Sequence, residues 1–577
     1  MKKKKYQKEG KIILGINGWT DRCHDAAATL IEVNGETMEI LGALEEEKVR
    51  GKKCVYDVFP TKSIEYLLEM FDLEPEDVDE IVFGWDYPYM YKEINKEFLF
   101  KDKQITAELF PNRKIGKNIP ITFMNHHKSH ASACFRTSPF NESIVVVIDG
   151  NGEREATSIW KNNGNNLENI ISLSPESSYG FLFEAANLLI GFEQHESGKT
   201  MGLAAYGKPV YYDQLKKYYD ENLEMNDEFL KLYKSVCRFC NTGVISFWQE
   251  CVVRTWMSIF QSELKIKMQN EAITSFYECA DELKNLAASI QYLLEQNVRE
   301  LVIKAVRETG IHNVCVAGGV ALNCTMNGKI LDLDEVDDIY VQPAAGDSGV
   351  SLGAALELAN ERGLCSRIDN AFTPYLGCEW EDSEIIDVLK KRNQSYVCVD
   401  DASNYVGKMI ADNKIIALFQ GRNEWGPRAL GNRSIISNAK KGQLDHINKN
   451  VKHRELGRPL APSILQEDCR ILNNVHKSYG KFMNIAYVTH KQDDNYASII
   501  HFDGSYRAQF VTEKMNKNYY NQLQAVKEKN RHSIVINTSF NNKTPVIFNV
   551  EQAVDFFEDR SIDAIIFNNR IILHRTK

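Results

Sequence analysis

The same succession of strand, glycine-rich turn and helix occurs twice between residues 314 and 360, and this repetition limits the fold more than any other feature. The first unit begins with the apolar run Val314–Ala317 and continues through a Gly-Gly turn. The second begins with Ile339–Val341 and passes through a Gly-Asp turn into the alanine-rich Val350–Asn360. Short apolar runs that alternate with helical patterns indicate βα units. We therefore predict an α/β fold.

The length of the chain predicts more than one domain. Its 577 residues, 43% of them hydrophobic, exceed what a single hydrophobic core usually organises. The periodic pattern of apolar residues is lost between residues 363 and 376. We therefore predict an N-terminal domain of residues 1–362, a linker at 363–376 and a C-terminal domain of residues 377–577.

Composition restricts the compartment and the partners. No apolar run of about 18 residues occurs, and the basic residues 1–8 are not followed by the apolar segment of a signal peptide. The cysteines show no repeated metal-binding spacing, because Cys237 and Cys240 form the only CxxC pair. The net charge of −10 disfavours nucleic acid, whose binding depends on many phosphate contacts. We predict a cytoplasmic protein with reduced thiols and without a nucleic-acid or membrane partner, and a homodimer is compatible with the sequence.

A pair of histidines, His126 and His130, precedes a run of small residues. Side chains four residues apart share one face of a helix, so both imidazoles could bind a single cation, while His127 would point elsewhere. A third ligand is needed, and the best candidate is Asp347, which follows an apolar strand in a glycine-rich turn. An isolated pair at this spacing more often only packs or caps a helix.

The chain opens with three short apolar runs that predict an antiparallel meander. Its first turn is polar and places His24 and Asp25 at the mouth of a strand, where loops often carry chemistry. The charge run Glu45–Lys53 follows the third strand. Its ordinary explanation is a solvated face, and the alternative is that one of its lysines binds a phosphate. The runs are Lys11–Gly15, Ala26–Val33 and Ile40–Leu44.

Two glycine-rich strand ends are candidates for an anion site. The β-branched run Ser143–Ile148 ends in Asp-Gly-Asn-Gly, and glycine at such a turn lets the backbone approach an anion closely. The run Val314–Ala317 ends in Gly-Gly before a helix start, where free amide groups face the strand end. The residues concerned are Asp149, Gly150, Gly152, Gly318, Gly319 and Asn323.

Arginine and lysine are concentrated in the C-terminal half. Between Arg422 and Arg458 there are nine Lys and Arg residues and three Asp and Glu residues, which gives this stretch a charge of +6. Guanidinium groups match phosphate and carboxylate bidentately, so the stretch predicts a pocket for a small phosphate ligand. A nucleic-acid groove is the rival interpretation, but the only aromatic residue in the stretch is Trp425. A polar turn that includes Asn537 and Ser539 follows a later strand and could add ligand contacts.

Together these motifs resemble the O-carbamoyltransferases of the nodulation and antibiotic-tailoring type, over nearly the whole chain. That family combines a TsaD-like N-terminal domain, which has the actin-like ATPase (ASKHA) fold with two subdomains, and an α+β YrdC-like C-terminal domain. The matching residues are His24, Asp25, His126, His127, Ser129, His130, Asp149–Glu153, Gly198–Gly202, Gly318–Asn323, Gly346, Asp347, Gly426–Ser434, Lys452, Arg454, Glu455, Arg458–Pro462 and Asn537–Asn541.

The resemblance implies a reaction in two steps. The C-terminal domain would convert carbamoyl phosphate and Mg-ATP to carbamoyl-adenylate, and the N-terminal domain would pass the carbamoyl group to a hydroxyl of a small-molecule acceptor, either a natural product or a glycan. The metal would be iron, although two His and one Asp would also bind zinc, manganese or cobalt. The resemblance assigns adenylate or ATP to Lys53, Asp149, Gly150, Gly152, Gly318, Gly319 and Asn323, and carbamoyl phosphate and ATP to Arg428, Lys452, Arg458, Arg507, Asn537 and Ser539.

His24 is the expected general base. An alcohol is a poor nucleophile at neutral pH, and histidine is the side chain whose ordinary pKa suits the removal of its proton. Asp25 could orient the ring. The alternative is a loop histidine that only bonds to the backbone.

Two other activities compete with this prediction. A tRNA threonylcarbamoyl transferase would use the same metal-bearing domain, but it would not need the arginine-rich C-terminal domain. An actin-fold nucleotide-binding protein or sugar kinase would not need the His126 and His130 pair. Metal content and ATP turnover with carbamoyl phosphate separate the three.

Overall fold

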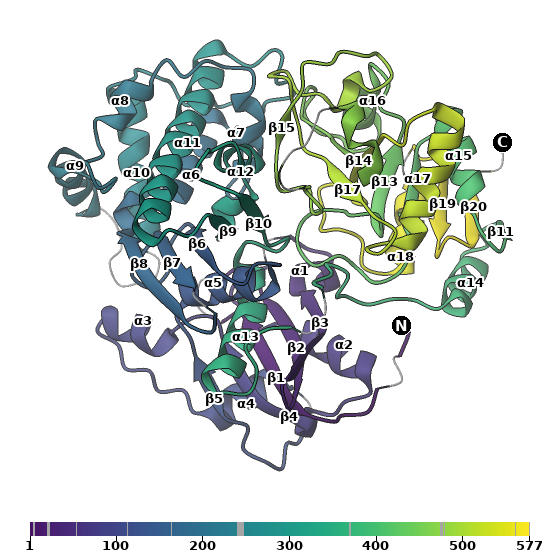
Figure 1. Ribbon diagram of the computed structural model, residues 1–577, viewed down its shortest axis with the longest axis horizontal. Helices are drawn as coiled ribbons and strands as arrows, with labels where there is room; N and C mark the ends of the chain where they lie inside the picture. Colours follow the sequence, from purple (N-terminus) through teal and green to yellow (C-terminus); the bar gives the residue numbers. More distant parts are fainter. Residues whose placement is uncertain are drawn as a thin grey trace.

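The computed structural model shows a chain with three large sheets (Figure 1). It describes residues 1–3, 6–19, 23–53, 55–111, 113–162, 164–238, 247–368, 371–472, 477, 479–559 and 561–575. Part of the first polar turn, Cys240 and part of the predicted linker lie outside these residues. No helix in the described part of the chain is both long and apolar enough to cross a membrane.

The first sheet has the strand order β3-β2-β1-β4-β5. The predicted meander is confirmed, because β2 pairs antiparallel with both β1 and β3. The last two strands run parallel to β1, which requires crossover connections, and α2 (Thr61–Phe71) lies in the first of them. The strands are β1 (Lys11–Asn17), β2 (Ala27–Asn34), β3 (Thr37–Glu45), β4 (Val78–Phe83) and β5 (Ile121–Phe123).

The second sheet repeats the topology of the first. Its order is β10-β9-β6-β7-β8, again with an antiparallel meander of three strands followed by two strands parallel to the first strand of the meander. The predicted α/β class is therefore confirmed, and residues 11–341 contain two sheets of one design. The strands are β6 (Ser143–Ile148), β7 (Thr157–Asn162), β8 (Leu167–Leu173), β9 (Asn313–Ala317) and β10 (Asp338–Val341).

Two helices lie between these sheets and bring them together. Helix α5 (His126–Thr137) packs against β6 and β9, and α13 (Val350–Glu361) packs against β1 and β2. The helices approach so closely that a Cβ at Gly353 would lie 1.8 Å from the Ser129 carbonyl oxygen. Glycine is required at this crossing, and the crossing places the N-terminal turn of α5 beside the ends of the central strands.

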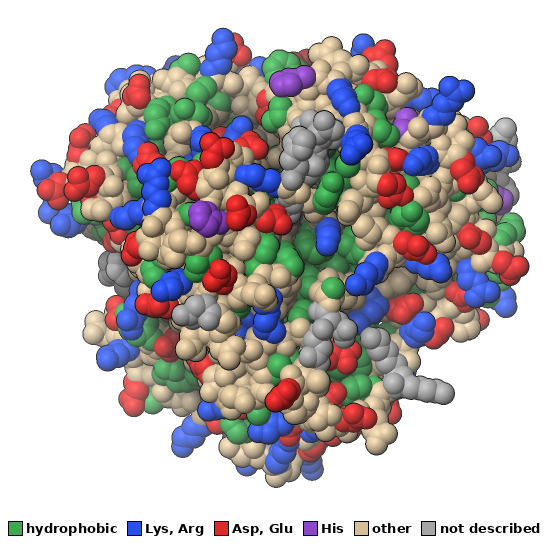
Figure 2. All heavy atoms as spheres, in the orientation of Figure 1, with side chains coloured by type: hydrophobic (Ala, Val, Ile, Leu, Met, Phe, Trp, Pro, Cys, Tyr) green, Lys and Arg blue, Asp and Glu red, His purple; other side chains and the backbone are tan. Residues whose placement is uncertain are grey.

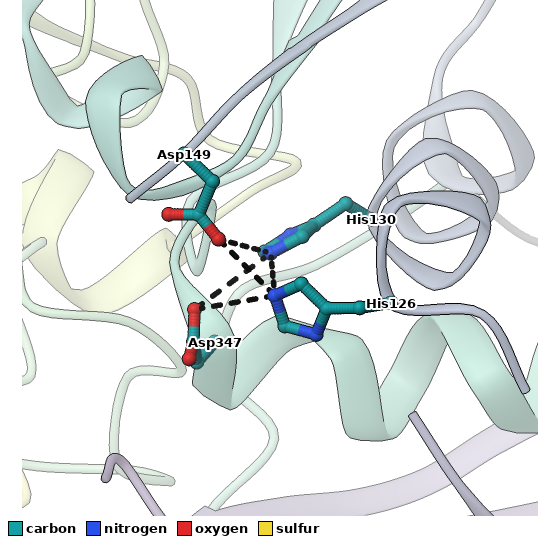
Figure 3. Close-up of side chains that lie close together, drawn as sticks. All are labelled: His126, His130, Asp149 and Asp347. Carbon is teal, nitrogen blue, oxygen red and sulfur yellow. Dashed lines mark hydrogen bonds and ion pairs between the residues drawn. The ribbon is translucent and has the colours of Figure 1, made fainter. Parts of the chain in front are cut away.

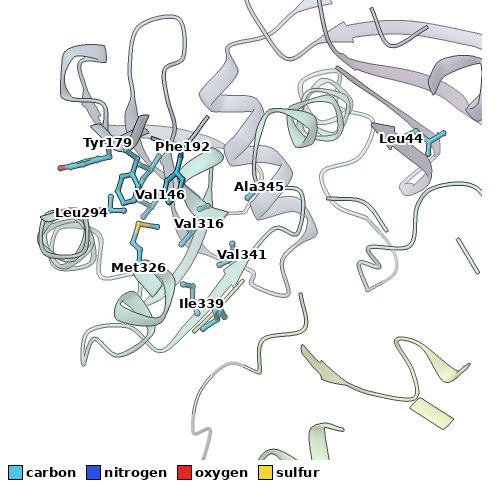
Figure 4. Close-up of a cluster of buried hydrophobic side chains, with 14 of the residues drawn as sticks. Leu44, Val146, Tyr179, Phe192, Leu294, Val316, Met326, Ile339, Val341 and Ala345 are labelled. Atoms are coloured by element: carbon cyan, nitrogen blue, oxygen red, sulfur yellow. The ribbon is translucent and has the colours of Figure 1, made fainter. Parts of the chain in front are cut away.

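A helical layer covers the outer face of the second sheet. Leu294 of α11 and Met326 of α12 pack with Val146 and Val316 of the sheet (Figure 4). The predicted long helix from Leu283 to about residue 308 is observed as α11 (Asp281–Thr309). The other helices of this region are α6 (Tyr179–Ile190), α7 (Ser197–Ala204), α8 (Tyr212–Lys216), α9 (Asp227–Cys237), α10 (Phe247–Ser262) and α12 (Cys324–Leu331).

The third sheet is mixed and has the order β11-β20-β19-β12-β13-β18-β14-β17. It lies entirely within residues 396–574, so in the described part of the chain no strand joins it to the first two sheets. Its strands are β11 (Tyr396–Cys398), β12 (Ile416–Phe419), β13 (Arg433–Ser437), β14 (Ala461–Leu465), β17 (Gln509–Val511), β18 (Val535–Ser539), β19 (Ala564–Phe567) and β20 (Ile571–His574). Its helices are α14 (Asp382–Lys391), α15 (Ser403–Ala411), α16 (Gln443–Asn450), α17 (Lys517–Asn530) and α18 (Val550–Asp559).

The beginning of the charge run Glu45–Lys53 is not a solvated face. Lys48 is buried, and its Nζ donates to Glu45 Oε1 and to the carbonyl oxygens of Glu424 and Gly426, each at 2.8 Å. The backbone N–H of Gly426 donates to the same Glu45 oxygen. The first of the two alternatives, a solvated face, is therefore wrong for this part of the run, because the C-terminal half covers these charges and supplies their partners.

Candidate active site

The histidine pair lies on the first turns of α5 because the preceding residues begin a helix there. The side chain of Asn125 caps the helix by accepting a hydrogen bond from the Lys128 N–H at 2.8 Å. The carboxylate of Glu153 accepts from the backbone N–H of His126 at 3.0 and 3.1 Å, where the helix dipole favours negative charge. His126 and His130 are therefore one helical turn apart, as predicted.

Both imidazoles face two carboxylates, Asp149 and Asp347 (Figure 3). The two Nε2 atoms are 3.1 Å apart, and Asp149 Oδ2 lies 3.1 and 3.2 Å from them. Asp347 Oδ1 lies 3.6 Å from His126 Nε2 and 3.8 Å from His130 Nε2. All four side chains are buried, and their nearest ligand atoms lie within 4.8 Å of one another.

The orientation of His126 suits a metal ligand. Its Nδ1 lies 3.0 Å from the carbonyl oxygen of Gly84, which can only accept, so Nδ1 carries a proton and Nε2 offers its lone pair toward the cluster. Trp85 stacks on the ring with 3.6 Å between centroids. Ligands bound at about 2.0–2.2 Å to one tetrahedral ion lie roughly 3.3–3.6 Å apart. Two imidazole nitrogens and two carboxylate oxygens at these separations fit a divalent cation such as iron, zinc, manganese or cobalt.

The charges of the cluster also favour a cation. Burial lowers the pKa of His126, but the negative charges of Asp347 and Asp149 outweigh burial and raise it to about 10. Burial raises the pKa of Asp149, but hydrogen bonds to His126 and His130 hold it well below its ordinary value. A proton and a metal ion therefore compete for the same position.

Asp149 is the ligand candidate that the sequence assigned to the adenylate. It directly follows β6, the strand from which the second meander starts, and its Oδ1 accepts a hydrogen bond from the Gly319 N–H at 3.0 Å. One sequence signal could have identified Asp149 as a ligand candidate. It is a carboxylate at the end of a buried central strand, and that strand belongs to the sheet against which the helix of His126 and His130 packs. The Gly319 amide is consequently not free for an anion.

His24 lies beside the cluster. Its Nε2 is 3.8 Å from Asp347 Oδ2, and its Nδ1 is 3.3 Å from Asp25 Oδ2, so the predicted orienting contact is present. The ring of His195 lies 5.1 Å from that of His24. Burial lowers the pKa of His24, but Asp347 and Asp25 outweigh burial and raise it to about 10. The imidazole is thus more basic than the ordinary value assumed from the sequence.

A cavity of about 400 Å³ adjoins the cluster and His24. Its wall includes the predicted N-terminal residues Asp149, Gly150, Gly319 and Asn323, and also Arg428 from the C-terminal half. The Nη2 atom of Arg428 donates to the Leu322 carbonyl oxygen at 3.2 Å. The face shown in Figure 2 is hollowed near its centre, with Lys and Arg side chains at the edge of the hollow. The structure therefore joins residues that the sequence divided between two separate sites.

Three of the predicted adenylate residues have other contacts. A Cβ at Gly152 would lie 2.7 Å from the ring of His127, so packing explains this glycine. Gly318 has φ +89°, and a Cβ there would lie 2.2 Å from the Ile148 carbonyl oxygen. The Asn323 side chain caps α12 by accepting from the Met326 N–H at 3.0 Å.

Five cationic side chains gather in the C-terminal half and form what we call the cationic cluster. Burial and the charges of Arg507 and Arg458 lower the pKa of Arg428 to about 9. Burial and neighbouring cations also lower the pKa values of Lys452, Arg454 and Arg507. Buried nitrogens of Arg428 (Nε) and Arg454 (Nη2) have no hydrogen-bond partner among the described residues. Such mutual repulsion and unused donors fit an anion such as phosphate.

The segment predicted as a polar turn lies against this cluster, but its residues Asn537 and Ser539 belong to β18, because the strand continues to Ser539. Lys452 Nζ donates to the carbonyl oxygen of Ser539 at 2.6 Å and to Asn541 Oδ1 at 2.6 Å. Asn537 instead bonds to Ala429 O and Ser463 Oγ in the interior. Lys53 is exposed, and its charge contributes to the lowered pKa of Lys452, so it lies toward the same cluster.

Comparisons with known proteins agree with the resemblance. Family models described as carbamoyltransferase N-terminus and carbamoyltransferase C-terminus match residues 89–356 and 407–574. The nodulation protein NolNO of Sinorhizobium fredii is 29% identical, over 96% of this chain and 79% of the relative. NolO of Bradyrhizobium diazoefficiens is 30% identical, over 78% of this chain and 79% of the relative.

A relative from antibiotic metabolism is similar over a comparable length. The 3'-hydroxymethylcephem-O-carbamoyltransferase of Streptomyces clavuligerus is 25% identical, over 79% of this chain and 81% of the relative. The two family models together cover most of the sequence, including His126, His130, Asp149, Asp347 and the cationic cluster. This chain therefore belongs to the carbamoyltransferase family and is an enzyme.

Proposed function

We propose that the protein is an ATP- and carbamoyl-phosphate-dependent O-carbamoyltransferase that forms carbamoyl-adenylate and transfers the carbamoyl group to a hydroxyl of a small-molecule acceptor. The observation that carries the proposal is one cavity whose wall includes His24, Arg428 and the two carboxylates of the four-residue metal candidate, Asp149 and Asp347. A group activated at the cationic cluster and a hydroxyl activated by His24 can meet there without leaving the protein.

The cationic cluster would carry out the first step. Carbamoyl phosphate and ATP bring several negative charges, and Lys452, Arg428 and Arg458 would bind their phosphates. Binding of these anions restores the charge balance among cations that otherwise repel one another. Water cleaves the P–O bond of carbamoyl phosphate to give inorganic phosphate and carbamate. A carbamate oxygen then attacks the α-phosphorus of ATP, the bond between that phosphorus and the bridging oxygen breaks, and pyrophosphate departs.

The cavity would carry out the second step. The acceptor oxygen attacks the carbamoyl carbon, the bond between that carbon and the adenylate oxygen breaks, and AMP leaves. His24 takes the proton of the acceptor hydroxyl at Nε2, while Asp25 holds Nδ1. His126, His130, Asp149 and Asp347 would hold the metal, which supplies a positive charge that polarises a carbonyl oxygen. We propose iron for this metal on the family resemblance.

The finer assignments of fold and surroundings belong to the same proposal. The repeated sheets of residues 11–341 support an actin-like ATPase fold for a TsaD-like domain of residues 1–362. The separate mixed sheet supports a YrdC-like domain of residues 377–577, with 363–376 as the linker. The acceptor would be a natural product or a glycan in the cytoplasm, and neither nucleic acid nor membrane would take part.

The test is to incubate the purified protein with Mg-ATP and carbamoyl phosphate and to measure pyrophosphate. We expect pyrophosphate release that depends on carbamoyl phosphate, and, with candidate acceptors, a product heavier by one carbamoyl group in mass spectrometry. Formation of ADP with a phosphorylated sugar would instead identify a kinase and contradict the proposal.

A further inference from the structure

One segment of the C-terminal half, Glu455–Pro459, is bonded to the N-terminal half by its backbone. Leu456 forms a β-bridge with Ser275, in which the Leu456 N–H donates to the Thr274 carbonyl oxygen at 2.9 Å. The Phe276 N–H donates to the Leu456 carbonyl oxygen at 2.9 Å. The segment follows Arg454 directly and contains Arg458, so two members of the cationic cluster flank or belong to it.

Side chains of the N-terminal half fix the same segment. The Tyr206 hydroxyl donates to the Gly457 carbonyl oxygen at 2.7 Å. Lys199 of α7 lies with its Nζ 2.9 Å from Glu455 Oε1 and 2.6 Å from Glu196 Oε2. The other oxygen of Glu455 accepts from Arg458 Nη1 at 3.2 Å. Two consecutive ion pairs thus connect Lys199 in one half through Glu455 to Arg458 in the other, and we call these three residues the ion-pair series.

The burial of the ion-pair series distinguishes it from ordinary surface ion pairs, which contribute little to stability. The side chains of Lys199 and Glu455 are only 15% and 10% exposed. Burial raises the pKa of Glu455, but Arg458 and Lys199 outweigh burial and lower it, so the carboxylate is charged between two cations. Removal of one of the two cations leaves the partly buried carboxylate of Glu455 with a single cationic partner. We expect the carboxylate to reorient toward the cation that remains.

Arg458 is the member of the cationic cluster whose orientation the ion-pair series fixes. Its charge lowers the pKa values of Arg428, Arg454 and Lys452, so it lies near all three. A guanidinium binds phosphate best when its plane is fixed, because the bidentate match depends on orientation. Glu455 holds one edge of the group, and Lys199 holds Glu455.

We propose that Lys199 is a positioning residue of the phosphate-binding site, although it belongs to the N-terminal half. Through Glu455 it fixes the guanidinium of Arg458 in the orientation that binds a phosphate of carbamoyl phosphate or ATP. The inference rests on the proposed function. It adds that the site of the first step is complete only when both halves are docked, because α7 closes it from the N-terminal side.

The experiment uses the full chain and the carbamoyl-phosphate-dependent release of pyrophosphate from ATP. Lys199→Met keeps the length of the side chain and removes its charge. We expect it to raise the KM for carbamoyl phosphate or ATP about tenfold while kcat changes by less than about threefold. Lys199→Arg should restore most of the loss. Because Lys199 acts through Glu455, Lys199→Met combined with Glu455→Gln should be no worse than Glu455→Gln alone.

The control is Lys217→Met, which removes an exposed lysine paired with Glu263 at 2.8 Å and should leave both constants unchanged. Unchanged KM values in Lys199→Met would overturn the inference, and so would a loss that Lys199→Arg does not repair or that adds fully to the loss in Glu455→Gln. If Lys199→Met does not fold, Glu455→Gln and Lys199→Arg decide: a raised KM in the first with a normal KM in the second supports it, and any other result overturns it. Absence of the reaction in the unaltered protein would contradict the proposed function instead.

Discussion

The backbone N–H of Gly319 donates to Oδ1 of Asp149 at 3.0 Å, and this bond leaves Oδ2 of the carboxylate directed at the histidine pair. It connects the turn after β6 with the turn after β9, the two glycine-rich strand ends of the second sheet. The same glycine that the sequence offered as an anion site therefore orients a ligand candidate.

Asp149→Asn tests whether this carboxylate binds metal or adenylate. The substitution keeps the shape and the bond from Gly319 but removes the negative charge. We expect metal affinity to fall by about tenfold to a hundredfold or more, measured as metal content after dialysis against a chelator. Asp25→Asn, which changes a carboxylate outside the four-residue cluster, should retain its metal. Full metal content in Asp149→Asn would contradict the role of Asp149 as a metal ligand and would favour the predicted contact with the adenylate.

Gly318→Ala should destabilise the protein strongly. Gly318 has φ +89°, and the added Cβ would lie 2.2 Å from a backbone oxygen. We expect the free energy of unfolding to fall by about 2 kcal/mol or more in thermal or denaturant unfolding. Gly310→Ala provides the control, since Gly310 has φ +69° with no atom within 4 Å of the added Cβ. It should lose only about 1 kcal/mol, and equal losses would contradict the close contact at Gly318.

Arg428 and Lys452 should differ in the step that they affect. Lys452 bonds to Ser539 at the end of β18 and to Asn541, and it does not line the cavity, whereas Arg428 forms part of the cavity wall. Lys452→Ala should reduce pyrophosphate release by about tenfold or more and still transfer the carbamoyl group from supplied carbamoyl-adenylate. Arg428→Ala should impair both steps. If Arg428→Ala transfers the group normally, the cavity is not shared between the two halves.

His24→Asn should slow transfer by about a hundredfold or more while metal content and pyrophosphate release stay normal. The nearby carboxylates raise the pKa of His24 to about 10, and a metal that takes up part of the charge of Asp347 lowers it again. A base acts in its unprotonated form. The transfer rate of the metal-loaded enzyme should therefore rise with pH, and the midpoint of this rise should lie below pH 10. The variant should lose this rise. Near-normal transfer by His24→Asn would show that His24 is not the general base.

Local patterns predicted part of the site well. His126 and His130 could be paired from their spacing, because a capped helix fixes which side chains share a face. Asp347 could be added because a carboxylate in a glycine-rich strand-end turn is directed outward from the sheet. The repeated strand and helix pattern likewise predicted the α/β class, since it depends on neighbours in the sequence.

Contacts between distant residues explain what the sequence did not predict. The direction of Asp149 depends on Gly319, which is 170 residues away. The burial of Lys48 depends on carbonyl groups of Glu424 and Gly426, which reach it only after the C-terminal half has docked. Periodicity within a segment contains no information on such contacts. The sequence therefore left the charge run open between a solvated face and a phosphate-binding lysine, and it predicted an anion site at the glycine-rich turns.

The metal content of His126→Ala tests the account most directly. The substitution removes one of the four ligand candidates and the ring that bonds to Gly84, and it leaves the cationic cluster intact. The account predicts a folded protein that has lost its metal, still releases pyrophosphate from ATP with carbamoyl phosphate, and no longer transfers the carbamoyl group. A His126→Ala protein with a full complement of metal would contradict it.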